Sequence, residues 1–281
     1  MTFVPENLGL ATTGLPLLRD LVNERTGLFY DDARLDYLGD RIAPLVLDRG
    51  FRTFLDFYYL LKYDERSAAE EWGRVLDALS VQETYFWREV DQIRALACAI
   101  LPGLEQAARR GPIRIWSAPC ASGEEPLTIA MMLSETGWFD RLPVAIHASD
   151  GSSAAIAKAR RGVYGQRSFR ALPPALREKY FIENDSGASP VPELSRRISS
   201  WSVVNLVARD EVAPHAGSHV IFCRNAFIYF SPTTVKQVVE TFADRMPSPA
   251  YLFVAASESL LRVTDRFRLD DVSGAFVYVK N

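Results

Sequence analysis

The sequence has few of the residues that build metal centres and disulfide frameworks. Its 281 residues include only three cysteines and three histidines. The cysteines are odd in number and share no C-x-x-C spacing, which favours a reducing compartment over a disulfide framework. The histidines form no cluster with the spacing of metal ligands, so we expect no metal. These absences argue against a disulfide-rich secreted protein and favour a cytoplasmic one.

Long apolar runs and a strong charge of one sign are also missing. No stretch approaches the roughly 20 apolar residues of a membrane span, and residues 1–6 lack the basic and apolar regions of a signal peptide. The formal net charge of -3 gives no reason to expect binding to nucleic acid or membranes. The motifs G-x-G-x-x-G and G-x-x-x-x-G-K-[ST] do not occur, which weighs against nicotinamide dehydrogenases and nucleoside triphosphatases.

The sequence does contain one segment that is typical of a ligand-binding turn. Residues 113–117 form a β-rich run, small residues follow as far as Gly123, and Pro126 precedes an apolar helical pattern. In doubly wound α/β folds, nucleotide-like ligands bind at such strand–turn–helix junctions, where glycine allows close approach of the backbone. Glu124 and Glu125 follow the glycine, and two carboxylates suit a ribose diol or a cation better than a pyrophosphate. A first-turn carboxylate that favours the helix dipole explains one of them equally well.

Two regions of different pattern divide the chain. Residues from about 15 to 100 carry apolar side chains at helical spacing, which predicts a helical domain at 1–101. From residue 113, short β-rich runs alternate with helical patterns, which predicts a mostly parallel sheet with helices on both faces in a domain at 111–281. Residues 165–202 interrupt the alternation and predict an inserted loop with short strands. The expected strands are 113–117, 144–149, 203–206, 220–223, 251–255 and 276–280.

Polar residues stand at the ends of three predicted strands. Asp150 follows the second strand, where an acidic side chain can bind both ribose hydroxyls, although a helix N-cap is an equal alternative. Asn205 and Leu206 end the third, where a turn asparagine is the common alternative. Arg224 and Asn225 follow the fourth, and a polar pair between apolar runs at this edge favours ligand binding.

Tyr229 and Arg88 have both a structural and a functional interpretation. Tyr229 lies between two apolar residues, which is typical of a core tyrosine, but its spacing of four from Asn225 favours a place at the same crevice. Arg88 follows three aromatic residues, where a stacked surface arginine is the usual alternative.

Four segments, in the same order, resemble the motifs of one known family. Residues 122–126, S-G-E-E-P after a W-S-A strand, resemble the adenosylmethionine-binding loop of CheR-type chemotaxis receptor methyltransferases. Residues 83–88 resemble the family's E-T-x-F-F-R, residues 158–164 its K-A-R-x-G-x-Y, and residues 222–230 its F-C-R-N-x-x-I-Y-F. The resemblance runs from about residue 15 to the C-terminus, and four ordered matches make it specific.

The resemblance implies a Rossmann-like methyltransferase sheet with an N-terminal all-α domain and a small β-subdomain inserted at 165–202. It also implies methyl transfer from S-adenosylmethionine to glutamate side chains of a signalling or chemoreceptor protein, which gives glutamyl methyl esters and S-adenosylhomocysteine. Arg88, orienting the substrate carboxylate, and Tyr229, holding the attack geometry, are the implied catalytic residues. The implied cofactor-binding residues are Gln82, Thr84, Arg88, Glu125, Asp150, Asn205, Leu206, Arg224 and Asn225.

Two departures from the family's pattern bear on these implications. The family usually has D-I-D where this chain has Asp150, Gly151 and Ser152, so an apolar contact to the adenine is lost. The family's basic helix, associated with docking acidic receptor helices, corresponds to residues 31–41, whose charges are mixed. We expect a monomer that acts on an acidic helical segment of a receptor or signalling protein. A methyltransferase for another acceptor and a non-catalytic cofactor-binding module are the alternatives, and the presence of Arg88 and Tyr229 argues against the latter.

Overall fold

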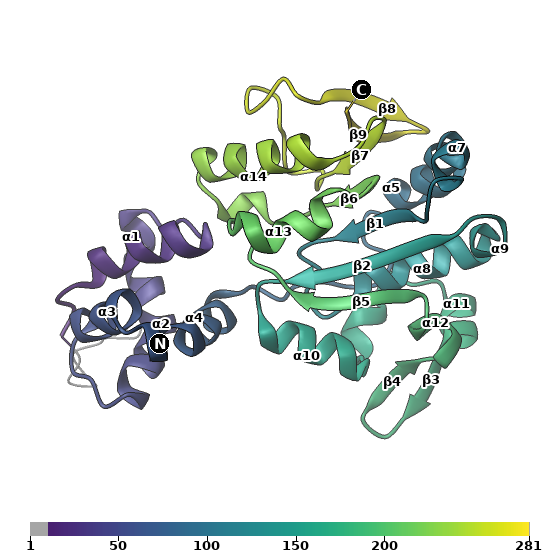
Figure 1. The fold of residues 1–281 in the computed structure, drawn as a ribbon. Helices are drawn as coiled ribbons and strands as arrows, with labels where there is room; N and C mark the ends of the chain where they lie inside the picture. The colour runs from purple at the N-terminus through teal and green to yellow at the C-terminus, as the bar shows by residue number, and fades with distance from the viewer. Residues whose placement is uncertain (1–10, 281) are drawn as a thin grey trace.

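The computed structural model describes residues 11–280, which form a helical part and an α/β part (Figure 1). Residues 1–6, which were expected to form no signal peptide, lie outside the described residues. So do residues 1–10 of the predicted helical domain and residue 281 of the predicted sheet domain. No helix among residues 11–280 is both long enough and apolar enough to cross a membrane.

The helical part surrounds an apolar core of its own. Its elements are α1 (Leu15–Thr26), η2 (Asp32–Arg34), α2 (Leu35–Asp48), α3 (Phe54–Tyr63) and α4 (Glu65–Leu79). Apolar side chains at helical spacing face inward, and Leu18, Ile42 and Val75 are completely buried. Pro16 lies in the first turn of α1. Asp64 caps α4 by accepting hydrogen bonds from two backbone N–H groups of its first turn.

The α/β part is built on a mostly parallel sheet. Its strands are β1 (Ile113–Ser117), β2 (Val144–Asp150), β5 (Ile198–Val203), β6 (Val220–Phe222), β7 (Ala250–Phe253), β8 (Arg268–Val272) and β9 (Ala275–Lys280). They lie in the order β5-β2-β1-β6-β7-β9-β8; β9 runs antiparallel to β7 and β8, and the other described pairs of this sheet are parallel. The chain moves outward from β1 to β5 and then returns to β6. The strand order therefore reverses between β1 and β6, where ligands bind in open α/β sheets.

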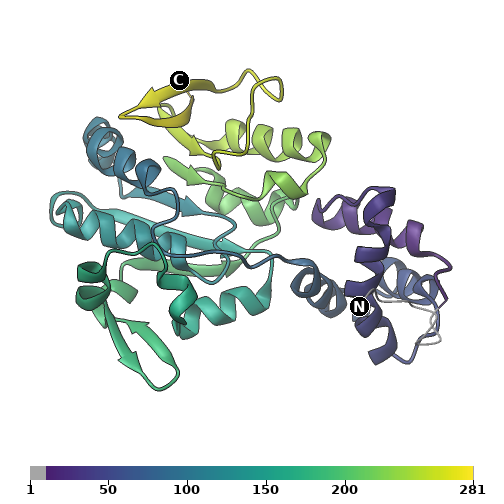
Figure 2. The same ribbon diagram turned by 180° about the vertical axis from the view of Figure 1, so that it is seen from behind.

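Helices cover both faces of this sheet (Figures 1 and 2). They are α5 (Val90–Ala95), α6 (Leu101–Gly103), α7 (Glu105–Ala108), α8 (Glu124–Glu135), α9 (Trp138–Arg141), α10 (Ser153–Arg161), α11 (Pro174–Tyr180), α12 (Pro192–Ser195), α13 (Arg209–Ala216) and α14 (Pro232–Arg245), with shorter turns at Leu96–Ile100, Gln166–Phe169 and Phe227–Tyr229. Ile115 of β1 packs in the core with α5 and α8, and the adjacent Trp116 in the core with α13 and α14. Because consecutive side chains of a strand point to opposite faces, the sheet is buried on both sides.

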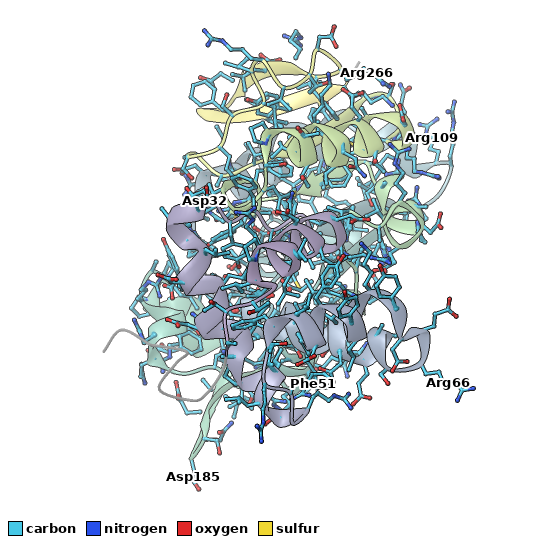
Figure 3. All side chains as sticks on the ribbon, turned by 90° about the vertical axis from the view of Figure 1, so that its left-hand side faces the viewer. Asp32, Phe51, Arg66, Arg109, Asp185 and Arg266 are labelled. Atoms are coloured by element: carbon cyan, nitrogen blue, oxygen red, sulfur yellow. The ribbon has the colours of Figure 1, made fainter. Side chains whose placement is uncertain are left out.

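Two predictions around the insertion are wrong. The strand predicted at 203–206 ends at Val203, because β5 begins earlier and residues 204–206 form a loop. β5 pairs with β2, so it belongs to the main sheet although it lies within the predicted insertion at 165–202. The antiparallel pair of the insertion is β3 (Phe181–Asn184) with β4 (Gly187–Pro190), and Asp185 marks the tip of this hairpin away from the sheet (Figure 3). Three of the six residues of β5 are serines, so the strand lacks the apolar run that marks a strand of the main sheet.

The predicted boundary of the helical domain at residue 101 is too late. α5 contacts α8 and β9, and its Ile93 belongs to the core of the sheet. Helical spacing cannot distinguish these cases, because an amphipathic helix packs equally well on a helix or on a sheet. An extended connection after α4 joins the two parts, and the parallel strands point their carboxyl ends toward the helical part (Figure 1).

Candidate active site

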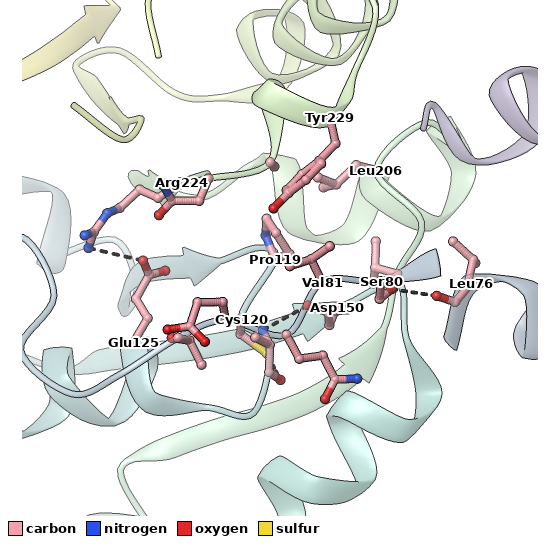
Figure 4. Close-up of a pocket in the computed structure, with 18 of the residues that line it drawn as sticks. Leu76, Ser80, Val81, Pro119, Cys120, Glu125, Asp150, Leu206, Arg224 and Tyr229 are labelled. Atoms are coloured by element: carbon pink, nitrogen blue, oxygen red, sulfur yellow. Dashed lines mark hydrogen bonds and ion pairs between the residues drawn. The ribbon is translucent and has the colours of Figure 1, made fainter. Parts of the chain in front are cut away.

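One pocket lies between the helical part and the carboxyl ends of β1, β2 and β6 (Figure 4). It contains the point at which the strand order reverses. All ten residues singled out in the sequence line it: Gln82, Thr84, Arg88, Glu125, Asp150, Asn205, Leu206, Arg224, Asn225 and Tyr229. The structure therefore brings together residues from the connection between the two parts and from the ends of four strands.

Asp150 ends β2, and its carboxylate faces the turn after β1. Oδ2 accepts a hydrogen bond from the N–H of Ala121 at 2.9 Å, and Oδ1 accepts one from the N–H of Ser152 at 2.9 Å. Burial raises the pKa of the Asp150 carboxyl, while the two N–H groups act in the opposite direction. The N-cap of α10 is Ser152, whose hydroxyl accepts from Ala155, so the N-cap interpretation of Asp150 is wrong. A carboxylate has about four acceptor positions, which leaves Asp150 two for groups in the pocket.

The two glutamates at the start of α8 have different surroundings. Glu124 is buried and accepts hydrogen bonds from the hydroxyls of Ser122 at 2.7 Å and Ser168 at 2.9 Å. Glu125 lines the pocket and accepts a hydrogen bond from Ser117 Oγ at 2.6 Å. The first glutamate therefore stabilises the turn, and the second is available to a ligand.

Arg224 is a buried cation between two carboxylates. Nη1 lies 3.2 Å from Glu125 Oε2 (Figure 4), Nη2 lies 3.3 Å from Glu89 Oε2, and 2% of the Arg224 side chain is exposed. Nη2 also donates to the carbonyl of Arg88 at 2.9 Å. Burial raises the pKa of Glu125, and Arg224 opposes this shift. Two carboxylates share this guanidinium, and the charge of Arg88 also acts on Glu125. Of the two carboxylates, Glu125 lines the pocket and can face a cationic group of a ligand.

Arg88 lies in an unusual stretch of backbone. Trp87 and Glu89, on either side, have positive φ angles of 71° and 47°, which residues of this size rarely adopt. Arg88 Nη1 donates to the Glu83 carbonyl at 3.0 Å, and its guanidinium carbon is 5.6 Å from the centre of the Tyr85 ring. The stacking interpretation is thus correct for the ring contact, yet the same arginine also lines the pocket. Such strain occurs at functional sites.

Tyr229 ends the 3-10 turn Phe227–Tyr229 and points into the pocket toward Pro119 (Figure 4). It is half-buried, which differs from the core interpretation of this residue. Burial raises the pKa of its phenol, and the charge of Arg88 acts in the opposite direction, so the two side chains lie within electrostatic reach. The phenol therefore keeps its proton at neutral pH and can donate a hydrogen bond.

Asn205 connects the pocket wall to the helical part. Its Nδ2 donates to the carbonyl of Arg25 at the end of α1 at 2.7 Å, and its Oδ1 accepts from the N–H of Val207 at 3.2 Å. The turn-asparagine interpretation is therefore correct, and both ends of the amide are engaged by protein. The neighbouring Leu206 is buried and lines the pocket.

The helical part contributes contacts that the sequence analysis missed. Leu76 of α4 lines the pocket, and its Cδ2 lies 3.7 Å from the position that a Cβ on Gly151 would occupy. Asp77 accepts from the hydroxyl of Ser152 at 2.6 Å and from the N–H of Ala154 at 3.1 Å. No local pattern signals these contacts, because the aspartate and the serine are 75 residues apart.

Two family models match the chain on either side of the connection. The all-alpha domain of CheR methyltransferases matches residues 14–80, and the CheR methyltransferase SAM binding domain matches residues 82–275.

The chain belongs to the CheR methyltransferase family.

It is therefore an S-adenosylmethionine-dependent methyltransferase, and the CheR SAM binding match contains all ten residues named above. The CheR all-alpha match covers α1 to α4. Family membership thus confirms the predicted fold class, an all-α domain followed by a methyltransferase sheet.

Curated relatives of the CheR family resemble most of the chain. It is 31% identical over 253 residues to "Chemotaxis protein methyltransferase 2" of Vibrio cholerae, covering 89% of this chain and 87% of that one. It is 28% identical over 268 residues to "Chemotaxis protein methyltransferase" of Escherichia coli, covering 94% and 90%. It is also 31% identical over 262 residues to "Probable biofilm formation methyltransferase WspC" of Pseudomonas putida, covering 92% and 60%.

Proposed function

We propose that S-adenosylmethionine binds in this pocket with its ribose at Asp150 and its amino-acid end at Glu125. Asp150 keeps acceptor positions that suit a diol. Glu125 lines the pocket beside the buried Arg224, and its carboxylate favours an ammonium or sulfonium. The observation that carries the proposal is this arrangement of the two carboxylates, one at each end of a single pocket.

Apolar side chains form the wall that suits the adenine. Leu76, Val81, Val204 and Leu206 line this side of the pocket and offer a surface on which a flat ring buries its faces. Gly151 leaves space that Leu76 borders from the helical part. The apolar contact that the family's D-I-D pattern supplies therefore comes, in this proposal, from α4.

Gln82 and Thr84 extend over the pocket from the connection between the two parts. The Gln82 amide Nε2 donates to Ser152 Oγ at 3.3 Å, which holds the connection near the end of β2. We assign both residues to closing the cofactor site.

The chemistry requires little proton transfer. Bound S-adenosylmethionine supplies an electrophilic methyl group, which a carboxylate oxygen takes up in one displacement. A glutamate carboxyl with a pKa of about 4.3 is already ionised at neutral pH, so no side chain has to act as a base. Arg88 binds and orients this carboxylate through charge-assisted hydrogen bonds. Tyr229, which keeps its proton, donates a hydrogen bond that fixes the line of attack.

We propose that the acceptor is a glutamate on an acidic helical segment of a chemoreceptor-type protein. The relatives named chemotaxis protein methyltransferase support this, because they resemble about nine-tenths of the chain. All proposed site residues come from one chain, so we propose that a monomer is active. The scheme needs no metal, because an ionised carboxylate attacks without a Lewis acid.

A second candidate acceptor belongs to another signalling system. The exposed side chains of Asp31, Asp32, Arg34 and Asp36 make the start of α2 more negative than positive, which does not complement an acidic helix. The relative named for biofilm formation supports the same alternative.

Label transfer distinguishes these acceptors. The chain is incubated with radiolabelled S-adenosylmethionine and a chemoreceptor cytoplasmic fragment, and the product is then treated with base. We expect label that base releases, because esters hydrolyse where N-methyl groups do not. The control is the same fragment with its acceptor glutamates changed to alanine. Label that survives base would overturn the ester, and labelling of another signalling protein instead of the receptor would favour the second candidate.

A further inference from the structure

We propose that Glu258 is a positioning residue that holds the turn carrying Asn225 and Tyr229. This inference rests on the proposed function of the pocket and extends it to a residue outside the described pocket lining. Glu258 lies in the loop after β7, about 30 residues beyond the turn that it contacts. Its role would therefore be exerted through the backbone of the turn.

The Glu258 carboxylate accepts hydrogen bonds from four backbone N–H groups. Oε1 accepts from Phe227 at 2.8 Å and Ile228 at 3.3 Å. Oε2 accepts from Asn225 at 2.9 Å and Ala255 at 2.9 Å. Three of the four donors belong to one turn between β6 and α14.

That turn needs an external acceptor. Asn225 has a positive φ of 58°. The first N–H groups of the 3-10 turn that follows have no carbonyl one turn earlier in a helix to accept their hydrogen bonds. Phe227 is buried and Asn225 is half-buried, and an N–H group without a partner there is costly. One carboxylate accepts from both of these N–H groups and from that of Ile228, and thereby fixes the backbone directly before Tyr229.

Glu258 is itself anchored to the sheet. Its N–H donates to the carbonyl of Ala255 at 2.9 Å, and the N–H of Leu260, two residues further on, donates to the hydroxyl of Tyr278 on β9 at 2.8 Å. On the other side, Gln92 of α5 donates to the carbonyl of Val254 at 2.8 Å. The turn is thus tied to a rigid support, and the helical part completes the restraint through a hydrogen bond from the Phe29 N–H to the Tyr229 carbonyl at 2.8 Å.

A carboxylate is required because both oxygens only accept. In Glu258→Gln, one oxygen becomes an NH2 group that faces N–H donors, while the volume stays the same. Misplacement of a catalytic group by about 1 Å can cost about 100-fold in rate. The amide variant should therefore lower kcat, about tenfold to a hundredfold, more than it raises the Kd of S-adenosylhomocysteine.

The experiment combines kinetics with hydrogen exchange on the full chain. Label transfer to the receptor fragment gives kcat, and calorimetry gives the Kd of S-adenosylhomocysteine, for the wild type, Glu258→Gln, Tyr229→Phe and the double variant. The matched control is Glu193→Gln, which changes an exposed glutamate paired only with Arg196 among described residues. Amide exchange is followed at Asn225. If Glu258→Gln does not fold, Glu258→Asp keeps the charge and shortens the reach of the carboxylate by one methylene, which should also loosen the turn.

We expect faster exchange at the turn in Glu258→Gln and no change in the control. We also expect the double variant to be no slower than Tyr229→Phe alone, because Glu258 acts through Tyr229. Unchanged exchange and kcat in Glu258→Gln would overturn the proposal, as would effects that multiply in the double variant. A wild-type rate in Tyr229→Phe would instead refute the proposed role of the tyrosine. Faster exchange at the turn would then still support the structural hold by Glu258.

Discussion

Replacing Asp77 with alanine should loosen the helical part from the cofactor side of the sheet. Asp77 accepts hydrogen bonds from Ser152 Oγ at 2.6 Å, Ser153 Oγ at 2.9 Å and the Ala154 N–H at 3.1 Å. It therefore adds a carboxylate from α4 to the N-terminus of α10, where the helix dipole favours negative charge. Ser152 also donates its N–H to Asp150, so the contact adjoins the proposed ribose site.

The magnitude follows from these contacts. Hydrogen bonds to a charged group contribute about 1.5–3 kcal/mol, and a charge at a helix terminus about 0.3–1 kcal/mol. Ser153 and Ala154 are exposed, so water replaces part of the loss. We expect the free energy of unfolding to fall by about 2–3 kcal/mol, which lowers Tm by about 4–10 °C for a chain of this size. The Kd of S-adenosylhomocysteine should rise by up to about tenfold, because Ser152 supports Asp150.

The assay compares Asp77→Ala with Asp48→Ala in thermal unfolding and calorimetry. Asp48 pairs with Arg74 in the same helical part, but its side chain is 65% exposed, and an exposed pair contributes about 0–1 kcal/mol. A Tm and an affinity for Asp77→Ala that match those of Asp48→Ala would refute the reasoning, since the contact between the two parts would then contribute nothing.

The remaining predictions concern the pocket itself. Asp150→Ala should weaken binding of S-adenosylhomocysteine by about 1.5–3 kcal/mol in calorimetry, and unchanged affinity would exclude the ribose assignment. Arg88→Ala and Tyr229→Phe should lower kcat far more than they raise the Kd of S-adenosylhomocysteine, because both act on the acceptor side; label transfer at saturating cofactor tests this, and full turnover in both would contradict it. Cofactor affinity should fall on acidification, because a protonated Glu125 carboxyl cannot balance an ammonium. The fall should begin at a pH above the ordinary pKa of a glutamate, because burial raises the pKa of Glu125. Glu125 affects folding stability in the opposite direction, because a pKa raised in the folded state gives stability at acid pH that is lost as the pH rises through that pKa. On acidification, Glu125 should therefore lower cofactor affinity while it raises Tm. Titrations of affinity and of Tm should show these opposite trends in the wild type and not in Glu125→Gln.

Three of the pocket residues could be predicted from local signals, whereas Gln82 and Thr84 were implied by the family resemblance alone. Asp150 and Arg224 follow apolar strands, Glu125 follows a glycine turn, and parallel strands bring their carboxyl ends to one edge. Once the strands are located, the meeting of these side chains follows from topology. The separate tasks of Glu124 and Glu125 did not follow, because they depend on Ser168, which lies 44 residues from Glu124.

The elements that escaped prediction lie at the edges of the sheet. β8 reads Arg-Leu-Asp-Asp-Val, and charged residues are typical of an exposed edge strand but give no apolar run. β5 is the other edge; a short strand was predicted in this stretch, but its pairing with β2 in the main sheet was not. The π-helical turn Leu96–Ile100 and α5 were predicted as helix but assigned to the wrong core, because amphipathicity does not identify the partner.

The departure at Gly151 and Ser152 is best explained together with the helical part. The Ser152 hydroxyl has three partners, since it caps α10, accepts from Gln82 and donates to Asp77. A carboxylate at position 152 would turn the contact with Asp77 into repulsion between like charges. A Cβ at position 151 would meet Leu76 Cδ2 at 3.7 Å, so a side chain as long as isoleucine would extend into the space that Leu76 borders. The two changes therefore fit α4 as it is placed here, and in the proposed cofactor site Leu76 takes over the apolar contact that the family's residue beside Asp150 supplies.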